Sequence, residues 1–224
     1  MSMRRFTLIV PIAFLAAVVS LNAQQQPSAA QIKQERDTAE KDAPQLAEVL
    51  QIKPGMTIAD IGAGGGAFTV VLGRLFNTGK VYATDIGKTQ LEQIAAYVKQ
   101  EGLTNVTVLE GAPAATNLPA ACCDAMFMRD VYHHITDVAA FDRSLFASLK
   151  PGGRIAILDF RPRPNSKLPD GVNPNRGGHG VAPSTIEEEM KAAGFTHVKT
   201  FESWPPGENK QALFLVLFTK PVAP

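Results

Sequence analysis

The stretch Thr57-Ile58-Ala59-Asp60-Ile61-Gly62-Ala63-Gly64-Gly65-Gly66-Ala67 decides the fold of this chain. A short apolar run ends in Asp60, and glycines follow at alternate positions, 62, 64 and 66, before a helix-like segment. Glycine lets the backbone turn sharply and approach a ligand closely, because it has no Cβ atom. A helix N-terminus behind the turn offers free N–H groups and a partial positive charge. The stretch therefore predicts a strand, a tight turn and a helix that together bind a nucleotide-like cofactor.

The glycines alone fit more than one cofactor. Gly62, Gly64 and Ala67 match G-x-G-x-x-A, the dinucleotide fingerprint. Asp60 favours S-adenosylmethionine (SAM), because a carboxylate at this strand end opposes a pyrophosphate but suits the ammonium of a methionine moiety. A P-loop is excluded, since Tyr82 stands where the first glycine of that motif is required. A nucleotide-dependent oxidoreductase remains as the alternative.

A second carboxylate supports a nucleoside ligand. The apolar run Lys80–Thr84 predicts the next strand, and Asp85 follows it directly. An acidic residue about 20 positions after the glycines is placed to accept hydrogen bonds from ribose hydroxyls. Both cofactor classes need that contact, so Asp85 does not choose between them.

Strands and helices alternate along the chain, which predicts a parallel α/β sheet with right-handed crossovers. A turn at residues 150–153 precedes the fifth strand, and a helix at 183–193, capped by Ser184 or Thr185, precedes a closing hairpin. Residues 31–50 are helix-like, with Pro44 starting a new helix. The predicted strands span 57–61, 80–84, 106–109, 124–128, 154–160, 196–201 and 212–219, and the helices between them span 67–76, 88–101 and 137–149.

Residues 161–180 break this alternation. They are rich in proline and glycine and show no periodicity. A long irregular loop in a compact domain is usually a functional lid or disorder. Because this one leaves the carboxyl end of the fifth strand, the ligand edge of such sheets, we expect a lid.

The N-terminus has the layout of a secretory signal peptide. Arg4 and Arg5 precede an apolar run at 6–19, and the small residue Ala23 precedes a polar stretch. We expect residues 1–23 to be a leader, 24–30 a spacer and 31–224 one domain, which contains the glycine-rich turn. The protein is then exported to the periplasm or secreted, with no stable membrane association after cleavage. An uncleaved membrane anchor is the alternative.

Composition limits the partners. The formal net charge is +1, and lysine and arginine are scattered, which argues against a nucleic-acid partner. The two cysteines, Cys122 and Cys123, are adjacent and poorly placed to bridge each other. A thiol metal site would need a third soft ligand, so no metal site is predicted. The sequence does not indicate the oligomeric state.

Several motifs together resemble the class I SAM-dependent methyltransferases. The first is D-x-G-x-G-x-G from Asp60 to Gly66, and the second is Leu109-Glu110-Gly111-Ala112. The others are residues 124–134, which look like the fourth strand and its loop, and the turn at 149–154. The nearest group is the broad methyltransferase-domain family, related to quinone-biosynthesis and arsenite methyltransferases. The resemblance implies a Rossmann-like sheet of order 3-2-1-4-5-7-6 with an antiparallel last strand.

The resemblance also implies a SAM site. Many relatives carry an acidic residue where this chain has Ala112, so one polar contact to adenine is missing here. That difference keeps a non-catalytic SAM-binding protein as a further alternative. The expected cofactor-binding residues are Asp60, Gly62, Ala63, Gly64, Gly66, Asp85, Ile86, Gly111, Ala112 and Arg129.

The expected catalytic residues are His133 and His134, which follow the fourth strand near the methyl group. Either histidine would serve as base for a hydroxyl or amine acceptor. Asp130, Tyr132 and His179 are weaker pocket candidates. The implied reaction moves a methyl group to a small molecule that the sequence does not identify.

Overall fold

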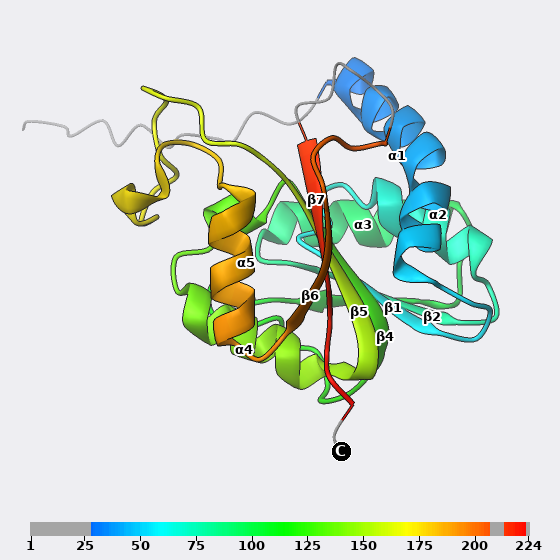
Figure 1. Cartoon of the computed structure of the whole chain (residues 1–224). Helices are drawn as coiled ribbons and strands as arrows, with labels where there is room; N and C mark the ends of the chain where they lie inside the picture. The colour runs from blue at the N-terminus through cyan, green and yellow to red at the C-terminus, as the bar shows by residue number, and fades with distance from the viewer. Residues whose placement is uncertain (1–27, 207–212, 223–224) are drawn as a thin grey trace, which may run out of the picture.

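The computed structural model describes residues 28–206 and 213–222 and contains a seven-stranded sheet of order β3-β2-β1-β4-β5-β7-β6 (Figure 1). The first five strands in this order pair in parallel, and β7 pairs antiparallel with both β5 and β6. The predicted strand order and the antiparallel last strand are confirmed. The strands are β1 Thr57–Ile61, β2 Lys80–Asp85, β3 Val106–Glu110, β4 Cys123–Arg129, β5 Leu149–Phe160, β6 Thr196–Phe201 and β7 Leu213–Thr219.

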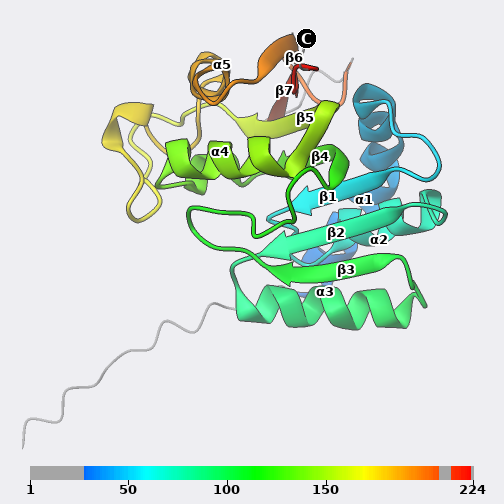
Figure 2. The ribbon, with the colours of Figure 1, turned by 90° about the horizontal axis from the view of Figure 1, so that it is seen from below.

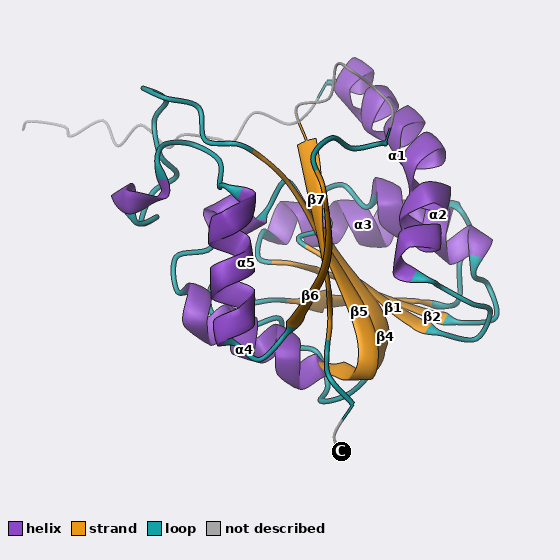
Figure 3. Ribbon diagram, in the orientation of Figure 1, coloured by secondary structure: helices purple, strands orange, loops and turns teal. Residues whose placement is uncertain are grey.

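Helices cover both faces of the sheet (Figures 2 and 3). Helices α1 Ala29–Leu50, α2 Ala67–Leu75 and α3 Lys88–Gln100 pack on one face. Helices α4 Val138–Ser148 and α5 Pro183–Ala192 pack on the other. Two short 3₁₀ helices, η1 Tyr132–His134 and η2 Pro174–Arg176, lie beyond the carboxyl ends of β4 and β5.

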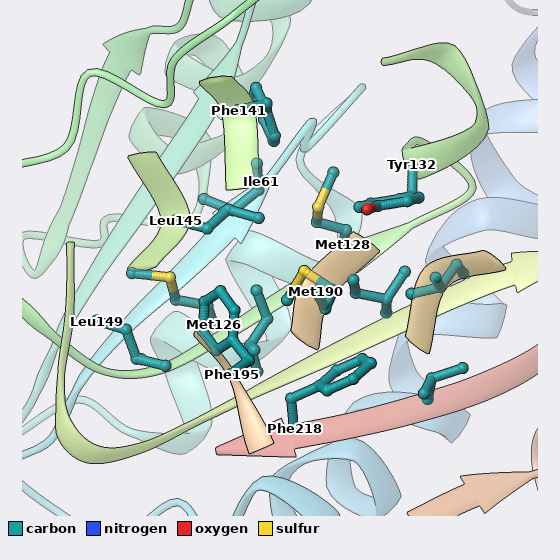
Figure 4. Packing of buried hydrophobic residues seen from close by; sticks show 14 of the residues in the cluster. Ile61, Met126, Met128, Tyr132, Phe141, Leu145, Leu149, Met190, Phe195 and Phe218 are labelled. Carbon is teal, nitrogen blue, oxygen red and sulfur yellow. The ribbon is translucent and has the colours of Figure 1, made fainter. Parts of the chain in front are cut away.

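The central strands are buried on both faces, which explains their nearly continuous apolar sequences. Along β4, Ala125 and Phe127 face α1 and α2, whereas Met126 and Met128 face α4 and α5. Figure 4 shows the apolar cluster on the face covered by α4 and α5, in which Met126 and Met128 pack with Leu145 of α4. This rigid core fixes the strand ends from which the candidate site is built.

Three local predictions were wrong. Pro44 lies inside one continuous helix, α1, instead of starting a new one. Burial of the α1 face that carries Ala43 and Leu46 compensates for the hydrogen bond that proline cannot make. Helix α5 is capped by Ala182 with Pro183 in its first turn, and neither Ser184 nor Thr185 is the cap. Residues 150–153, predicted as a turn before the fifth strand, lie within β5. The pairing of β4 with β5 shifts register there, between the pairs Cys123 to Leu149 and Ala125 to Arg154.

Within the described ranges, none of the helices combines the length and apolar character needed to cross a membrane. The predicted leader, 1–23, and residues 24–27 of the predicted spacer lie outside these ranges.

Candidate active site

A cleft of about 670 Å³ opens where the strand order reverses, between β1 and β4. This switch point is where open α/β sheets bind ligands. The cleft is lined by the glycine loop after β1, the carboxyl ends of β2 and β4, the segment after β4 with η1, and the helices α1, α2 and α3. Its lining residues are Gln31, Gln34, Glu35, Thr38, Asp60, Gly62, Ala63, Gly64, Gly65, Ala67, Phe68, Asp85, Gln90, Phe127, Arg129, Asp130, Val131 and His134.

Asp85 holds the glycine loop in shape. Its Oδ2 accepts the N–H of Gly64 at 3.0 Å, and its Oδ1 accepts the N–H of Gly87 at 2.9 Å. Each carboxylate oxygen keeps a further lone pair for a ligand hydroxyl. The sequence predicted a carboxylate that faces the ligand, but it did not predict this bracing contact.

Gly62 shows why the first position of the loop requires glycine. Its φ is +72°, and a Cβ atom there would lie 2.6 Å from a methyl group of Val131. At Gly64, by contrast, a Cβ would meet nothing within 4 Å, because that residue borders the open cleft. The third glycine, Gly66, lies against Ile94 of α3 and is not among the lining residues.

Asp60 is buried, with only 3 % of its surface exposed. The Thr69 hydroxyl donates to its Oδ2 at 2.6 Å. Burial raises the pKa of Asp60 to about 7; Asp85 adds to the rise, and Thr69 and Arg129 oppose it. The carboxyl group therefore titrates near neutral pH.

Arg129 also lines the cleft and gives it a positive charge. Its guanidinium lies 5.4 Å from the centre of the Phe68 ring, and its Nε is buried without a hydrogen-bond partner. Buried polar groups in folded proteins usually have partners. An unpaired donor beside the cleft therefore marks a place where a ligand acceptor fits.

The predicted adenine-side residues lie next to the cleft but do not line it. The N–H of Gly111 donates to the Asp85 carbonyl at 2.9 Å, which holds the end of β3 against β2. Ala112 pairs with Ala115 in a short bridge. Ile86 is 64 % exposed, and its side chain lies beside Gly111.

The two predicted catalytic histidines occupy different environments. His134 is exposed and lines the cleft, and its pKa is lowered by partial burial and by the neighbouring His133 and His179. His133 is 2 % exposed and does not line the cleft. The Nδ1 of His133 donates to Asp159 at 2.8 Å, and its Nε2 lies 3.2 Å from the Nε2 of His179.

Among the weaker candidates, Asp130 lines the cleft, whereas Tyr132 is fully buried. The Tyr132 hydroxyl donates to Asp142 of α4 at 2.8 Å. Burial, the Asp142 carboxyl and Glu189 raise the pKa of the Tyr132 hydroxyl well above its usual value. Tyr132 therefore anchors η1 to the core and does not face the ligand.

Sequence reasoning missed the contribution of two helices to the cleft. Gln31, Gln34, Glu35 and Thr38 of α1, with Gln90 of α3, form one wall. The predicted helix 31–50 gave one signal, namely that residues 33–38 are all polar or charged. A polar stretch of helix at the ligand edge of the sheet is consistent with a wall that contacts a polar ligand.

The irregular segment 161–180 folds back over the carboxyl ends of β4 and β5. Arg163 and His179 form an antiparallel bridge across it. Arg176 is buried and donates to the Tyr132 carbonyl at 3.2 Å and to Glu189 of α5 at 2.6 Å. The segment is thus fixed to the core at Arg176 and carries His179 to the site.

The adjacent cysteines lie away from the cleft. Cys123 begins β4, and the cleft lies at the opposite end of that strand. The two Sγ atoms are 2.6 Å apart, and both cysteines are free.

The sheet order is that of the class I methyltransferase fold, with carboxylates at the ends of β1 and β2. Residues 59–157 match the family described as "Methyltransferase domain". The chain is also 30% identical, over 111 residues, to the ubiquinone/menaquinone biosynthesis C-methyltransferase UbiE of Escherichia coli (strain K12 / DH10B). That alignment covers 49% of this chain and only 44% of the relative.

Solved structures share the fold at lower identity. A SAM-dependent methyltransferase from Aquifex aeolicus superposes with a TM-score of 0.66 at 22% identity, over 86% of this chain and 98% of the other. The [4+2]-cyclase SpnF superposes with a TM-score of 0.67 at 15% identity, over 90% and 86%. At such identities the likeness concerns the fold alone, and one of these two proteins is described as a cyclase.

The chain therefore has the fold of the class I SAM-dependent methyltransferases, and residues 59–157 match the methyltransferase-domain family. The resemblance to this family that the sequence predicted is confirmed.

Proposed function

We propose that this chain binds SAM in the cleft and transfers its methyl group to a small-molecule acceptor. One observation carries the proposal: a carboxylate and a guanidinium, Asp60 and Arg129, line the same cleft as a second carboxylate, Asp85. The first pair suits the ammonium and carboxylate of a methionine moiety, and Asp85 suits ribose hydroxyls. The cleft volume of about 670 Å³ lies within the usual range for ligand sites.

The same charges argue against a dinucleotide. A pyrophosphate bound at the glycine loop would lie beside the Asp60 carboxylate, which repels it. The backbone of Gly62 to Gly65 would hold the methionine part of SAM. Ile86 would contact the adenine, to which Ala112 offers only backbone groups.

On the acceptor side, His134 is favoured over His133, because His134 lines the cleft and His133 is buried behind it. SAM supplies a methyl group that is already activated. The chain's own residues then align the acceptor, exclude water and take up a proton where the acceptor loses one.

Calorimetry with S-adenosylhomocysteine, the demethylated cofactor, tests the proposal. We expect Asp85→Ala to weaken binding by about 1–3 kcal/mol, because ribose hydroxyls lose a charged acceptor. Asp170→Ala is the matched control, since that side chain is 94% exposed and does not line the cleft. Its affinity should equal that of the wild type.

Two results would contradict the proposal. A folded wild-type protein that binds NAD but neither SAM nor S-adenosylhomocysteine would indicate an oxidoreductase. Unchanged affinity in Asp85→Ala would remove this residue from the site. Transfer of labelled methyl from SAM to any member of a metabolite library separates the enzyme from a non-catalytic binding protein.

A further inference from the structure

Three of the four histidines in the chain meet beside the cleft, although the sequence separates them. His133 and His134 come from η1, and His179 lies 46 residues beyond His133. One nitrogen from each ring lies within 4.8 Å of the others. The ring centres are 4.1, 5.0 and 6.0 Å apart.

A buried carboxylate orients the central ring. Asp159, at the end of β5, is fully buried and accepts hydrogen bonds from the N–H of His133, the Nδ1 of His133 and the N–H of Phe160. With its Nδ1 proton bound to Asp159, the Nε2 of His133 has a free lone pair that points toward His179. A carboxylate behind an imidazole in this way is the usual support of a metal-binding histidine.

The spacing of the nitrogens fits a shared cation. The Nε2 atoms of His133 and His179 are 3.2 Å apart. Two nitrogens bound to one tetrahedral zinc ion, each at about 2.05 Å, are separated by about 3.3 Å. Two neutral rings can also share one hydrogen bond at this distance, but that explains neither the third ring nor the carboxylate behind the first.

We propose that His133, His134 and His179 bind one divalent transition-metal cation of the zinc type. Three imidazoles without a thiolate suit zinc, copper, iron or nickel, whereas magnesium and calcium prefer oxygen ligands. Three protein ligands leave a fourth position open. This proposal departs from the sequence-based expectation of no metal, which considered only the cysteines.

The open position would face the acceptor side of the cleft, because His134 lines the cleft. This step rests on the proposed function. An acceptor oxygen, nitrogen or sulfur bound there would lose its proton to solvent more readily, and His134 would then act as a metal ligand and not as the base. Its lone pair then forms the bond to the methyl carbon, and the pair of the broken carbon–sulfur bond stays on sulfur. Phe160, whose ring centre lies 4.6 Å from that of His133, shields the site on its buried side.

Cobalt(II) titration of the purified protein, made without a polyhistidine tag and treated with a chelator, tests the site. Cobalt is a visible probe of zinc-type coordination. We expect one equivalent to bind with tetrahedral absorption bands and to be displaced by zinc. His179→Ala should weaken binding by more than about 100-fold, and Asp159→Asn, which changes only the support of His133, by about 10–100-fold.

His197→Ala is the matched control, because His197 lies on β6, bonds to Thr200 and is outside the cluster. It should bind cobalt as the wild type does. Equal binding by His179→Ala and His197→Ala, or no binding by the wild type, would overturn the proposal.

Binding of S-adenosylhomocysteine, measured on the same samples, checks folding and separates the two proposals. His179 does not line the cofactor cleft, so His179→Ala should keep that affinity. If the protein binds cobalt through the three histidines but does not bind S-adenosylhomocysteine, the metal site stands and the proposed function is contradicted. If it binds S-adenosylhomocysteine but no cobalt, only the metal site is contradicted.

Discussion

The protonation state of Asp60 should control how tightly the cleft binds its cofactor. The pKa of Asp60 is raised to about 7, with Asp85 and Arg129 as its charged neighbours. A bound ammonium would hold the group ionised, so binding at lower pH must first remove a proton. We expect the affinity for S-adenosylhomocysteine to fall about tenfold from pH 8 to pH 6, measured by calorimetry.

Asp60→Asn is the control for this prediction. It should bind more weakly at pH 8 and should lose most of the change with pH, since the amide does not titrate. A wild-type affinity that stays constant from pH 6 to pH 8 would show that Asp60 does not contact a cationic ligand group.

The position of a single residue could be predicted from the sequence where that residue lies at the end of a predicted strand. Asp60 and Asp85 follow apolar runs, so their place at the ligand edge could be inferred from the sequence. The contacts of His133 with Asp159 and His179 could not, because they depend on how residues 161–180 return to the sheet. Residues 161–180 show no periodic pattern from which that path could be predicted, so His179 was only a weak candidate.

At the scale of elements, the segment 161–180 should depend on one buried anchor. Arg176 joins η2 to the Tyr132 carbonyl and to Glu189 of α5. We expect Arg176→Met to destabilise this segment by about 1–3 kcal/mol, since a partly buried carboxylate and a carbonyl lose their donor. Hydrogen exchange should speed up across 161–181 while the strands of the sheet keep their protection.

Arg161→Met is the matched control, because Arg161 pairs with Glu202 at an exposed site where ion pairs contribute little. If both variants leave exchange in the segment unchanged, Arg176 is not its anchor. If Arg176→Met exposes the whole sheet, the anchor supports the entire fold and not the segment alone.

Elements with strong periodicity were predicted within a few residues, because burial on one or two faces fixes their pattern. Errors arose where tertiary packing outweighed local preference. Pro44 is tolerated because the helix around it is buried on one side. The role of α1 as a cleft wall also depends on its position in space, which its sequence does not encode locally.

For the whole molecule, the order of the strands came from the resemblance and not from periodicity. Alternation predicts a parallel sheet, but several orders satisfy it. Export and cleavage after Ala23 stay predictions, because the leader lies outside the described residues.

The stability of the whole molecule should decrease as the pH rises from 5 to 7, in part because of Asp142. This group is 1 % exposed, and its Oδ1 has no hydrogen-bond partner. Burial raises its pKa to about 7; Glu189 adds to the rise, whereas Tyr132 and Arg176 oppose it. In the unfolded chain the pKa of aspartate is about 3.9. Between these values the folded state binds the proton more tightly, so the contribution is greatest near pH 4 and is lost by about pH 7.

Asp142→Asn should remove that contribution. We expect the free energy of unfolding of the variant, relative to the wild type, to increase by about 2 kcal/mol from pH 5 to pH 7. Urea denaturation at each pH measures it. The free energy of unfolding of Asp142→Asn should still decrease somewhat as the pH rises, because the pKa of Asp60 is raised in the same direction. The double variant Asp60→Asn/Asp142→Asn should therefore depend on pH even less. The free energy of unfolding of Asp170→Asn, a change at an exposed position, should vary with pH as that of the wild type does. Parallel curves for the wild type and Asp142→Asn would mean that Asp142 is ionised in the folded protein throughout this range.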